Sequence, residues 1–226
     1  MKEWVKQMRV AIFDFDGTLY SKETYQIMMD HLKEHPLYRK RYPQFMRTIL
    51  PPYIASKAKI YPTEKMRERS MQIYLNALNE LTIEEVDIYF EQIAQKMRED
   101  FNEAIVAKVK EHASDDFYMM LVSGAYTPLL HTAVQGLPFD TIIGTDIPVA
   151  NGKITSKSPI YHIQGTRKNE KIQQVLHGKK IDWQNSFAYA DSYSDLSVLS
   201  LVGNPVAVQP EPKLQTIAER REWTIL

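Results

Sequence analysis

Asp14 and Asp16 are the side chains whose spacing most directly suggests chemistry in this sequence. They follow the apolar run 10–13, Val-Ala-Ile-Phe, which is typical of a strand buried on both faces. Residues two apart on a strand point to the same side, so both carboxylates are expected to leave the strand's C-terminal end together. Two neighbouring carboxylates repel each other unless a cation or a shared proton relieves them, which favours a divalent metal ion here.

Gly17 and Thr18 complete the group Asp-Phe-Asp-Gly-Thr. Glycine permits a backbone turn that other residues resist, and threonine supplies a hydroxyl. An acidic turn after a strand would use the same Asp-Gly pair without any chemistry. A carboxylate can, however, attack phosphorus as a covalent nucleophile, and a second carboxyl can protonate the leaving oxygen. The group therefore fits the transfer of a phosphoryl group.

Polar residues also follow two later apolar runs. Ser123 and Gly124 follow the run 117–122, and Asp191 and Asp195 come after a further buried-type segment. Open parallel sheets bind ligands at the carboxyl ends of their strands, so these groups are expected to meet the first aspartate pair. A serine hydroxyl with the amides after it can hold an anion, although an ordinary turn between a strand and a helix would also explain Ser-Gly-Ala.

Residues 14–18 resemble motif one of the haloacid dehalogenase (HAD) superfamily of phosphohydrolases. The resemblance implies that Asp14 attacks phosphorus and that Asp16 acts as the general acid and base. True dehalogenases of the superfamily lack the second aspartate, so Asp16 indicates phosphate rather than halide. The expected cofactor is Mg²⁺, held by Asp14, the backbone carbonyl of Asp16 and Asp191, since hard cations prefer oxygen ligands.

The later groups resemble further motifs of the superfamily, in the same order along the chain. Ser123 and Gly124 match motif two, whose serine hydrogen-bonds the phosphoryl group, and Thr18 is assigned to the same phosphate site. Asp191 and Asp195 match motif four. Its first aspartate is the metal ligand, and its second supports the site or binds the metal through water.

A lysine is expected to complete the phosphate site, and the candidates are Lys168 and Lys171. Both lie in a helix predicted to open after Gly165, with Thr166 as its N-cap. Positive charge in the first helical turn opposes the helix dipole, so a compensating anion is expected beside Lys168. The order Gly-x-x-Lys followed by apolar residues also resembles motif three of HAD subclass IB. We therefore assign Lys168, with Lys171 as the alternative.

The order of elements predicts an α/β fold with an insertion. Strand and helix patterns alternate in residues 105–226, which together with 1–20 are expected to form a Rossmann-like, doubly wound, mainly parallel sheet. Residues 21–104 have helical periodicity throughout, which predicts an all-helical cap inserted directly after motif one. This arrangement resembles subclass IB, which includes phosphoserine phosphatase-like enzymes.

Three local signals give sharper predictions. The pair Pro51-Pro52 is expected to break the chain within the cap. The stretch 82–85, Thr-Ile-Glu-Glu, has the pattern of a capping box at the start of a helix. The pair Asn151-Gly152 between alternating segments predicts a hairpin.

Charges in the predicted cap are unevenly distributed. The segment 36–60 carries six basic residues and no acidic one, whereas 80–103 carries eight acidic residues and two basic ones. The two segments could pair as complementary helix faces, or the basic segment could form a lid that attracts an anionic substrate. Tyrosines among the basic residues add a membrane surface or nucleic acid as alternatives, which the balanced net charge disfavours.

The composition restricts the class of protein. The chain has 226 residues with 28 basic and 28 acidic side chains, so no net charge favours nucleic acid as a partner. It has no cysteine, which mildly favours a reducing compartment. Residues 1–6 lack an apolar signal segment, and no run approaches the ~20 apolar residues of a membrane span. We therefore expect a cytoplasmic protein without a membrane span.

The expected function is Mg²⁺-dependent hydrolysis of a small phosphate monoester, a small phosphorylated metabolite, through an aspartyl-phosphate. A phosphomutase or phosphotransferase would share the first step, and a non-catalytic module that binds phosphate ligands could use the same scaffold. Glu23 is the first candidate for substrate selection, because phosphoserine phosphatase relatives carry a glutamate at this distance from motif one that contacts the substrate amine. A solvated glutamate in the first turn of a helix would also explain it. Arg47, Arg67 and Arg69 are candidates for binding a substrate carboxylate, and phosphoserine is one substrate among several small esters.

Overall fold

A sheet of six parallel strands organises the computed structural model, which describes residues 7–226 apart from the side chains of Thr63 and Glu64. Residues 1–6, which were expected to carry no signal segment and to begin the core, lie outside this part. In order across the sheet the strands are β3 (Thr141–Thr145), β2 (Tyr118–Tyr126), β1 (Val10–Phe13), β6 (Phe187–Ala190), β7 (Asn204–Ala207) and β8 (Thr224–Ile225). The chain builds outward from β1 to β3 and then crosses to β6 on the other side. The sheet is therefore doubly wound with its switch point at β1, which confirms the predicted fold class.

Strand β1 is buried on both faces because helices cover both sides of the sheet. Ala11 and Phe13 belong to one hydrophobic cluster, and Val10 and Ile12 belong to a second cluster on the opposite face. Burial of such side chains stabilises the fold by roughly 1.5–3 kcal/mol for each large one. Outside residues 21–104, the helices that pack on the first cluster are α5 (Glu103–Ser114) and α6 (Thr127–Ala133), and those that pack on the second are α7 (Thr166–Leu176), α8 (Leu196–Leu199) and α9 (Pro212–Arg220). The helices of residues 21–104 also contribute to the first cluster.

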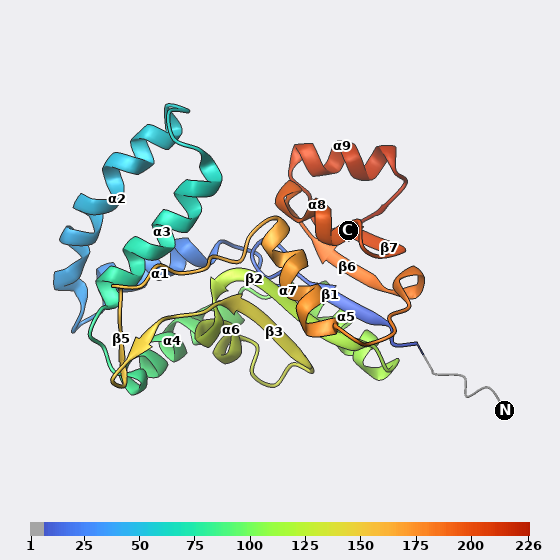
Figure 1. Ribbon diagram of the computed structural model, residues 1–226, viewed down its shortest axis with the longest axis horizontal. Helices are drawn as coiled ribbons and strands as arrows, with labels where there is room; N and C mark the ends of the chain where they lie inside the picture. Colours follow the sequence, from blue (N-terminus) through green and yellow to red (C-terminus); the bar gives the residue numbers. More distant parts are fainter. Residues whose placement is uncertain (1–6) are drawn as a thin grey trace.

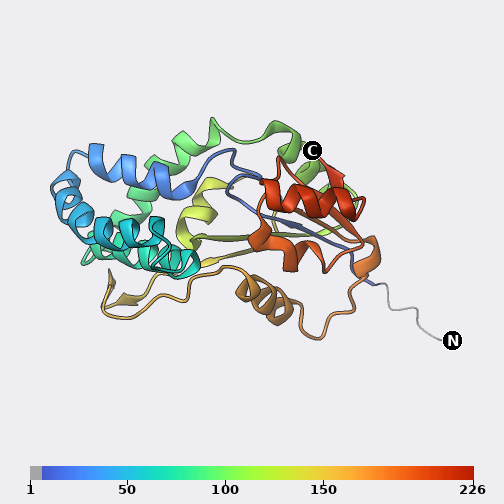
Figure 2. The same ribbon diagram turned by 90° about the horizontal axis from the view of Figure 1, so that it is seen from above.

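Helices also fill the segment that was expected to form the inserted cap. They are α1 (Thr24–Glu34), a 3₁₀ helix at Arg39–Arg41, α2 (Tyr42–Lys57), α3 (Thr63–Leu78) and α4 (Ile83–Arg98). Helices α2 and α3 form the end of the molecule that lies farthest from β7 and α9 (Figures 1 and 2). Helix α4 begins with the predicted capping box, in which the Thr82 hydroxyl and the Glu85 carboxylate each accept from the other residue's backbone N–H. We call residues 21–104 the cap from here on.

The prediction of a chain break at Pro51 and Pro52 is wrong, because α2 runs through both residues. Proline lacks a backbone N–H, so the carbonyl groups of Arg47 and Thr48 lose their helical donors. Both of these residues are exposed, and water can therefore take the place of the missing donors. The N-cap prediction for α7 is also wrong by one residue. Gly165 is the N-cap, with φ 54°, a left-handed conformation that favours glycine.

The predicted hairpin is present as β4 (Val149–Ala150) and β5 (Lys153–Ile154), with Asn151 and Gly152 both at positive φ in the turn. Its position was not expected, because it reaches away from the sheet to the cap. The Ile154 backbone N–H donates to the Leu81 carbonyl at 2.8 Å, and the Glu80 N–H donates to the Ile154 carbonyl at 3.0 Å. The hairpin therefore attaches the cap to the second half of the chain.

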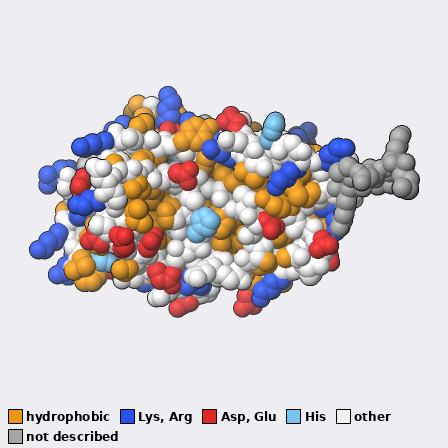
Figure 3. Space-filling model, turned by 60° about the horizontal axis from the view of Figure 1, so that its bottom comes forward, with side chains coloured by type: hydrophobic (Ala, Val, Ile, Leu, Met, Phe, Trp, Pro, Cys, Tyr) orange, Lys and Arg blue, Asp and Glu red, His pale blue; other side chains and the backbone are white. Residues whose placement is uncertain are grey.

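Ion pairing does not explain the uneven charge of the cap. Among the described residues, no ion pair joins the basic segment 36–60 to the acidic segment 80–103. Lys and Arg side chains gather at the cap end of the molecule (Figure 3). In the described part of the chain, no helix combines the length and the apolar character needed to cross a membrane.

Candidate active site

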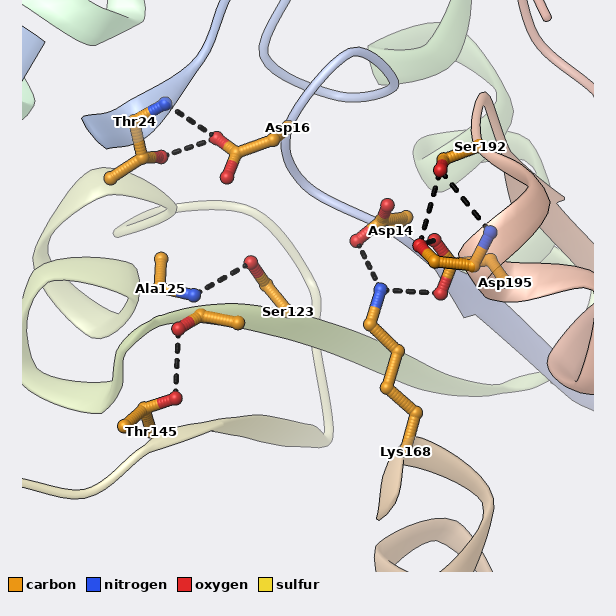
Figure 4. A network of polar contacts seen from close by, with 11 residues as sticks. Asp14, Asp16, Thr24, Ser123, Ala125, Thr145, Lys168, Ser192 and Asp195 are labelled. Carbon is orange, nitrogen blue, oxygen red and sulfur yellow. Dashed lines mark hydrogen bonds and ion pairs between the residues drawn. The ribbon is translucent and has the colours of Figure 1, made fainter. Parts of the chain in front are cut away.

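A buried ion-pair network lies at the carboxyl ends of β1 and β6 (Figure 4). The Lys168 Nζ donates to Asp14 Oδ1 at 2.8 Å and lies 2.5 Å from Asp195 Oδ1. All three residues are buried, with exposed fractions of 9% for Asp14, 5% for Lys168 and 2% for Asp195. Lys171 instead lies half-buried on the outer side of α7, where its Nζ contacts Gln174 Oε1 at 3.4 Å. The structure therefore brings Lys168, and not Lys171, to the aspartates.

The network keeps Lys168 charged. Burial alone would lower the pKa of Lys168, but the Asp14 and Asp195 carboxylates outweigh burial and raise it above its usual value. Lys168 lies in the first turn of α7, where the helix dipole disfavours a cation. The carboxylates of Asp14 and Asp195 are the compensating anions that were predicted there.

Three carboxylates converge beside this lysine. Oxygen atoms of Asp14, Asp191 and Asp195 all lie within 4.8 Å of one another. Burial, and then the Asp195 charge, raises the pKa of Asp14 well above its usual value, while Lys168 opposes the shift. Burial and Asp195 likewise raise the pKa of Asp191 to about 7. One lysine does not neutralise three carboxylates, so the excess charge and the oxygen donors fit a hard divalent cation such as Mg²⁺.

Gly17 allows the loop after β1 to pass close to the Asp191 side chain. A Cβ at this position would collide with the Asp191 carboxylate, and the backbone has φ 70°, which side-chain-bearing residues rarely adopt. The sequence suggested the turn, but the contact with a residue far along the chain depends on the fold.

Asp16 faces a different neighbour from Asp14. Its Oδ1 accepts from the Thr24 backbone N–H at 2.8 Å and from the Thr24 hydroxyl, at the N-terminus of α1 (Figure 4). Burial raises the pKa of Asp16 to about 6, although the Thr24 hydrogen bonds lower it. A carboxyl that titrates near neutral pH can both give and take a proton. Its side chain lies outside the three-carboxylate group, so the metal assignment of Asp16 depends on its backbone carbonyl alone.

The serine group lies on a strand rather than after one. Strand β2 continues to Tyr126, with a shift in its register against β3 between Val122 and Tyr126. Ser123 and Gly124 line the cavity, and the Ser123 Oγ accepts from the Ala125 N–H at 3.1 Å. Thr18 is fully buried and is not among the cavity-lining residues. Thr18 therefore does not face the cavity that Ser123, Gly124 and Lys168 line.

A cavity of about 280 Å³ lies between the cap and the aspartates. Glu23 lines it from the N-cap position of α1, and Arg67 lines it from α3. Arg69 borders a neighbouring groove instead, and Arg47 borders neither space. Sequence reasoning missed three lining residues in particular, Thr24, Ser70 and His162.

Asp191→Asn should stabilise the metal-free protein above pH 7 and weaken its dependence on pH. The folded pKa of Asp191, about 7, lies above the ordinary value of 3.8. The native state thus holds a proton that the unfolded state releases, and stability falls as pH rises from about 4 to about 7. Asparagine removes this titration, and we expect the free energy of unfolding at pH 8 to increase by on the order of 2 kcal/mol.

The measurement is thermal or urea unfolding in EDTA at pH 5 and pH 8. Asp30→Asn, at an exposed position of α1, is the matched control and should leave the pH dependence unchanged. An equal pH dependence in wild type and Asp191→Asn would contradict the assigned charge repulsion.

Known proteins similar to this chain include two phosphoserine phosphatases. Phosphoserine phosphatase SerB1 of Mycobacterium tuberculosis is 27% identical over 139 residues, which cover 62% of this chain and 44% of that protein. This chain thus spans less than half the length of that relative. A phosphoserine phosphatase of Methanocaldococcus jannaschii is 21% identical over 214 residues, covering 95% of this chain and 92% of that protein.

A solved structure shows the same fold over the whole chain. It is a protein of unknown function from Bordetella pertussis, which superposes with a TM-score of 0.79 at 22% identity and covers 98% of this chain and 99% of that one. The family model for haloacid dehalogenase-like hydrolases matches residues 11–200, a range that includes the whole aspartate and lysine network. The chain therefore belongs to the haloacid dehalogenase-like hydrolase family.

Proposed function

We propose that the protein is a Mg²⁺-dependent phosphatase that hydrolyses small phosphate monoesters through an aspartyl-phosphate on Asp14. The observation that supports this most is the buried pairing of Asp14 with Lys168 beside two further carboxylates, on the wall of a cavity. Membership of a hydrolase family and relatives named phosphoserine phosphatases support the same reaction class.

The reaction divides into two steps between Asp14 and Asp16. In the first, an Asp14 oxygen attacks phosphorus, the bond from phosphorus to the ester oxygen breaks, and Asp16 gives its proton to that oxygen. In the second, Asp16 takes a proton from water, whose oxygen attacks phosphorus and releases phosphate and free Asp14. The pKa of about 6 for Asp16 suits a group that must be protonated first and deprotonated later.

Hydrogen-bond donors that are fixed before the reaction stabilise the negative charge on the phosphoryl oxygens. Lys168 supplies a fixed positive charge, and the Ser123 hydroxyl and the Gly124 amide are further donors on the cavity wall. Asp14, Asp191 and the Asp16 carbonyl would hold Mg²⁺, which supplies charge stabilisation for the phosphate oxygens. Asp195 supports the site by holding Lys168 from the side opposite Asp14.

The substrate is proposed to be a small phosphorylated metabolite, and phosphoserine is a candidate. Glu23 and Arg67 line the same small cavity with opposite charges, which suits a leaving group that carries both an ammonium and a carboxylate. The names of the two bacterial and archaeal relatives support the same class of ester.

Hydrolysis of p-nitrophenyl phosphate tests the proposed function. The purified protein should release p-nitrophenol in Mg²⁺, lose the activity in EDTA and regain it when Mg²⁺ is added in excess. No turnover of this ester or of a panel of phosphorylated metabolites, in the presence of Mg²⁺, would exclude a phosphatase.

A further inference from the structure

His162 lines the cavity beside the phosphate site, and none of the steps above uses it. The residue is 5% exposed and lies four positions before α7. Its ring packs over Gly124, since a Cβ there would lie 2.8 Å from His162 Cε1 and 3.3 Å from Nε2. The Cε1–Nε2 edge of the ring therefore lies against Gly124, whose amide is assigned to phosphate, and both residues line the cavity.

Hydrogen bonds around Thr145 determine which ring nitrogen of His162 carries the proton. The Thr145 hydroxyl has one hydrogen and donates it to the Gly124 carbonyl at 2.7 Å (Figure 4). The same oxygen accepts from the Ile163 N–H at 3.1 Å. His162 Nδ1 lies 3.1 Å from this oxygen, whose hydrogen is already used, so Nδ1–H is the donor in that contact.

The imidazole is neutral at neutral pH. Burial lowers the pKa of His162 to about 4, and the charges of Arg67, Lys168 and Arg167 add to the effect, while a backbone contact with Gly124 opposes it. With Nδ1 protonated and the ring neutral, Nε2 has a free lone pair and can only accept.

An acceptor at this place does not suit a phosphate dianion, whose oxygens carry no hydrogen. A donor on the part of the substrate that leaves would suit this acceptor. Building on the proposed phosphatase activity, we propose that His162 Nε2 accepts a hydrogen bond from a hydroxyl or ammonium group near the ester oxygen. The enzyme thereby selects phosphate esters whose leaving group carries such a donor over esters with a bare alkyl group.

Three esters of equal length test this selection: propyl phosphate, 2-hydroxyethyl phosphate and 2-aminoethyl phosphate. They differ in one terminal group, so the ratios of their kcat/KM values isolate the donor. The wild type should prefer both donor-bearing esters over propyl phosphate by about tenfold or more, since a buried acceptor left unpaired costs about 1–3 kcal/mol.

His162→Phe keeps a ring over Gly124 and removes the acceptor, so the ratio for 2-hydroxyethyl over propyl phosphate should fall to within about threefold of unity. The 2-aminoethyl ester should keep the part of its preference that the Glu23 carboxylate supplies. His162→Gln places an amide oxygen near the position of Nε2 and should recover part of the preference. His131→Gln, at an exposed histidine of α6, is the matched control and should leave the ratios unchanged. Thermal unfolding verifies that each variant is folded. If His162→Phe does not fold, the ratios measured for His162→Gln decide whether the side chain at this position acts as an acceptor.

Two failures can be told apart. If the wild type fails to hydrolyse p-nitrophenyl phosphate as well as the three esters, the proposed function itself is wrong. If it hydrolyses p-nitrophenyl phosphate but does not prefer the donor-bearing esters, the role of His162 is overturned. Equal losses on all three esters in His162→Phe would also overturn it, because they would show that the ring serves only the phosphate or the position of Gly124.

Discussion

Asp14→Asn should give a folded protein whose kcat for phosphate esters is at least about a thousandfold below wild type. Asparagine has nearly the same shape as aspartate, but its amide oxygen is a poor nucleophile toward phosphorus. The change also removes one of three crowded carboxylates, while Asp195 still pairs with Lys168. We therefore expect the variant to be at least as stable as wild type in the absence of metal.

The measurements are steady-state hydrolysis of p-nitrophenyl phosphate in Mg²⁺ and thermal unfolding of both proteins. Mass spectrometry after an acid quench should detect a phosphorylated chain in the wild type and none in the variant. Asp30→Asn serves as the control for a neutralised surface aspartate. Turnover by Asp14→Asn near the wild-type rate would remove Asp14 as the nucleophile.

Lys168→Ala should lower kcat by about 10²–10⁴-fold, whereas Lys171→Ala should change it by less than about twofold. Removal of Lys168 takes away the positive charge beside Asp14 and leaves Asp14 and Asp195 buried without their cation. The pKa of Asp14 should then rise further, so less of the carboxylate is present to attack. A single broken buried pair costs about 3–5 kcal/mol of stability, so unfolding should also shift.

The two lysines are a matched pair on the same helix, one buried and one half-buried. Parallel assays of kcat and of thermal unfolding separate the catalytic loss from instability, and Lys168→Met keeps the apolar stem if the alanine variant does not fold. The opposite ranking, with Lys171→Ala the more damaged enzyme, would show that the wrong lysine has been assigned.

Local sequence patterns were sufficient to predict the secondary structure and burial of segments in which one chemical property dominates. The run 10–13 is apolar at every position, so it predicts a strand buried on both faces, and alternation then decides which residues face each cluster. The capping box at Thr82 needs only neighbours in sequence, and it was correct. Pro51 and Pro52 failed as a predicted break because the carbonyl groups that lose their donors belong to exposed residues of α2, which sequence alone does not reveal.

The site was predictable as far as its residues belong to strand ends or to family motifs. Asp14, Asp191 and Lys168 come together as expected, because parallel strands place their carboxyl ends at one edge. Thr24 and His162 were missed because nothing in their immediate neighbours marks them. Their roles depend on the start of α1 lying at Asp16 and on the ring lying over Gly124, contacts that only the folded chain creates.

The hairpin β4–β5 has a consequence for how the molecule unfolds. Ile154 exchanges backbone hydrogen bonds with Glu80 and Leu81, and its side chain, 2% exposed, belongs to the same hydrophobic cluster as Phe13 and Phe90. Two regions that share one cluster lose their buried surface together, so the cap has no separate melting transition of its own. We expect a chain that lacks residues 21–104 to expose that cluster to water and to aggregate.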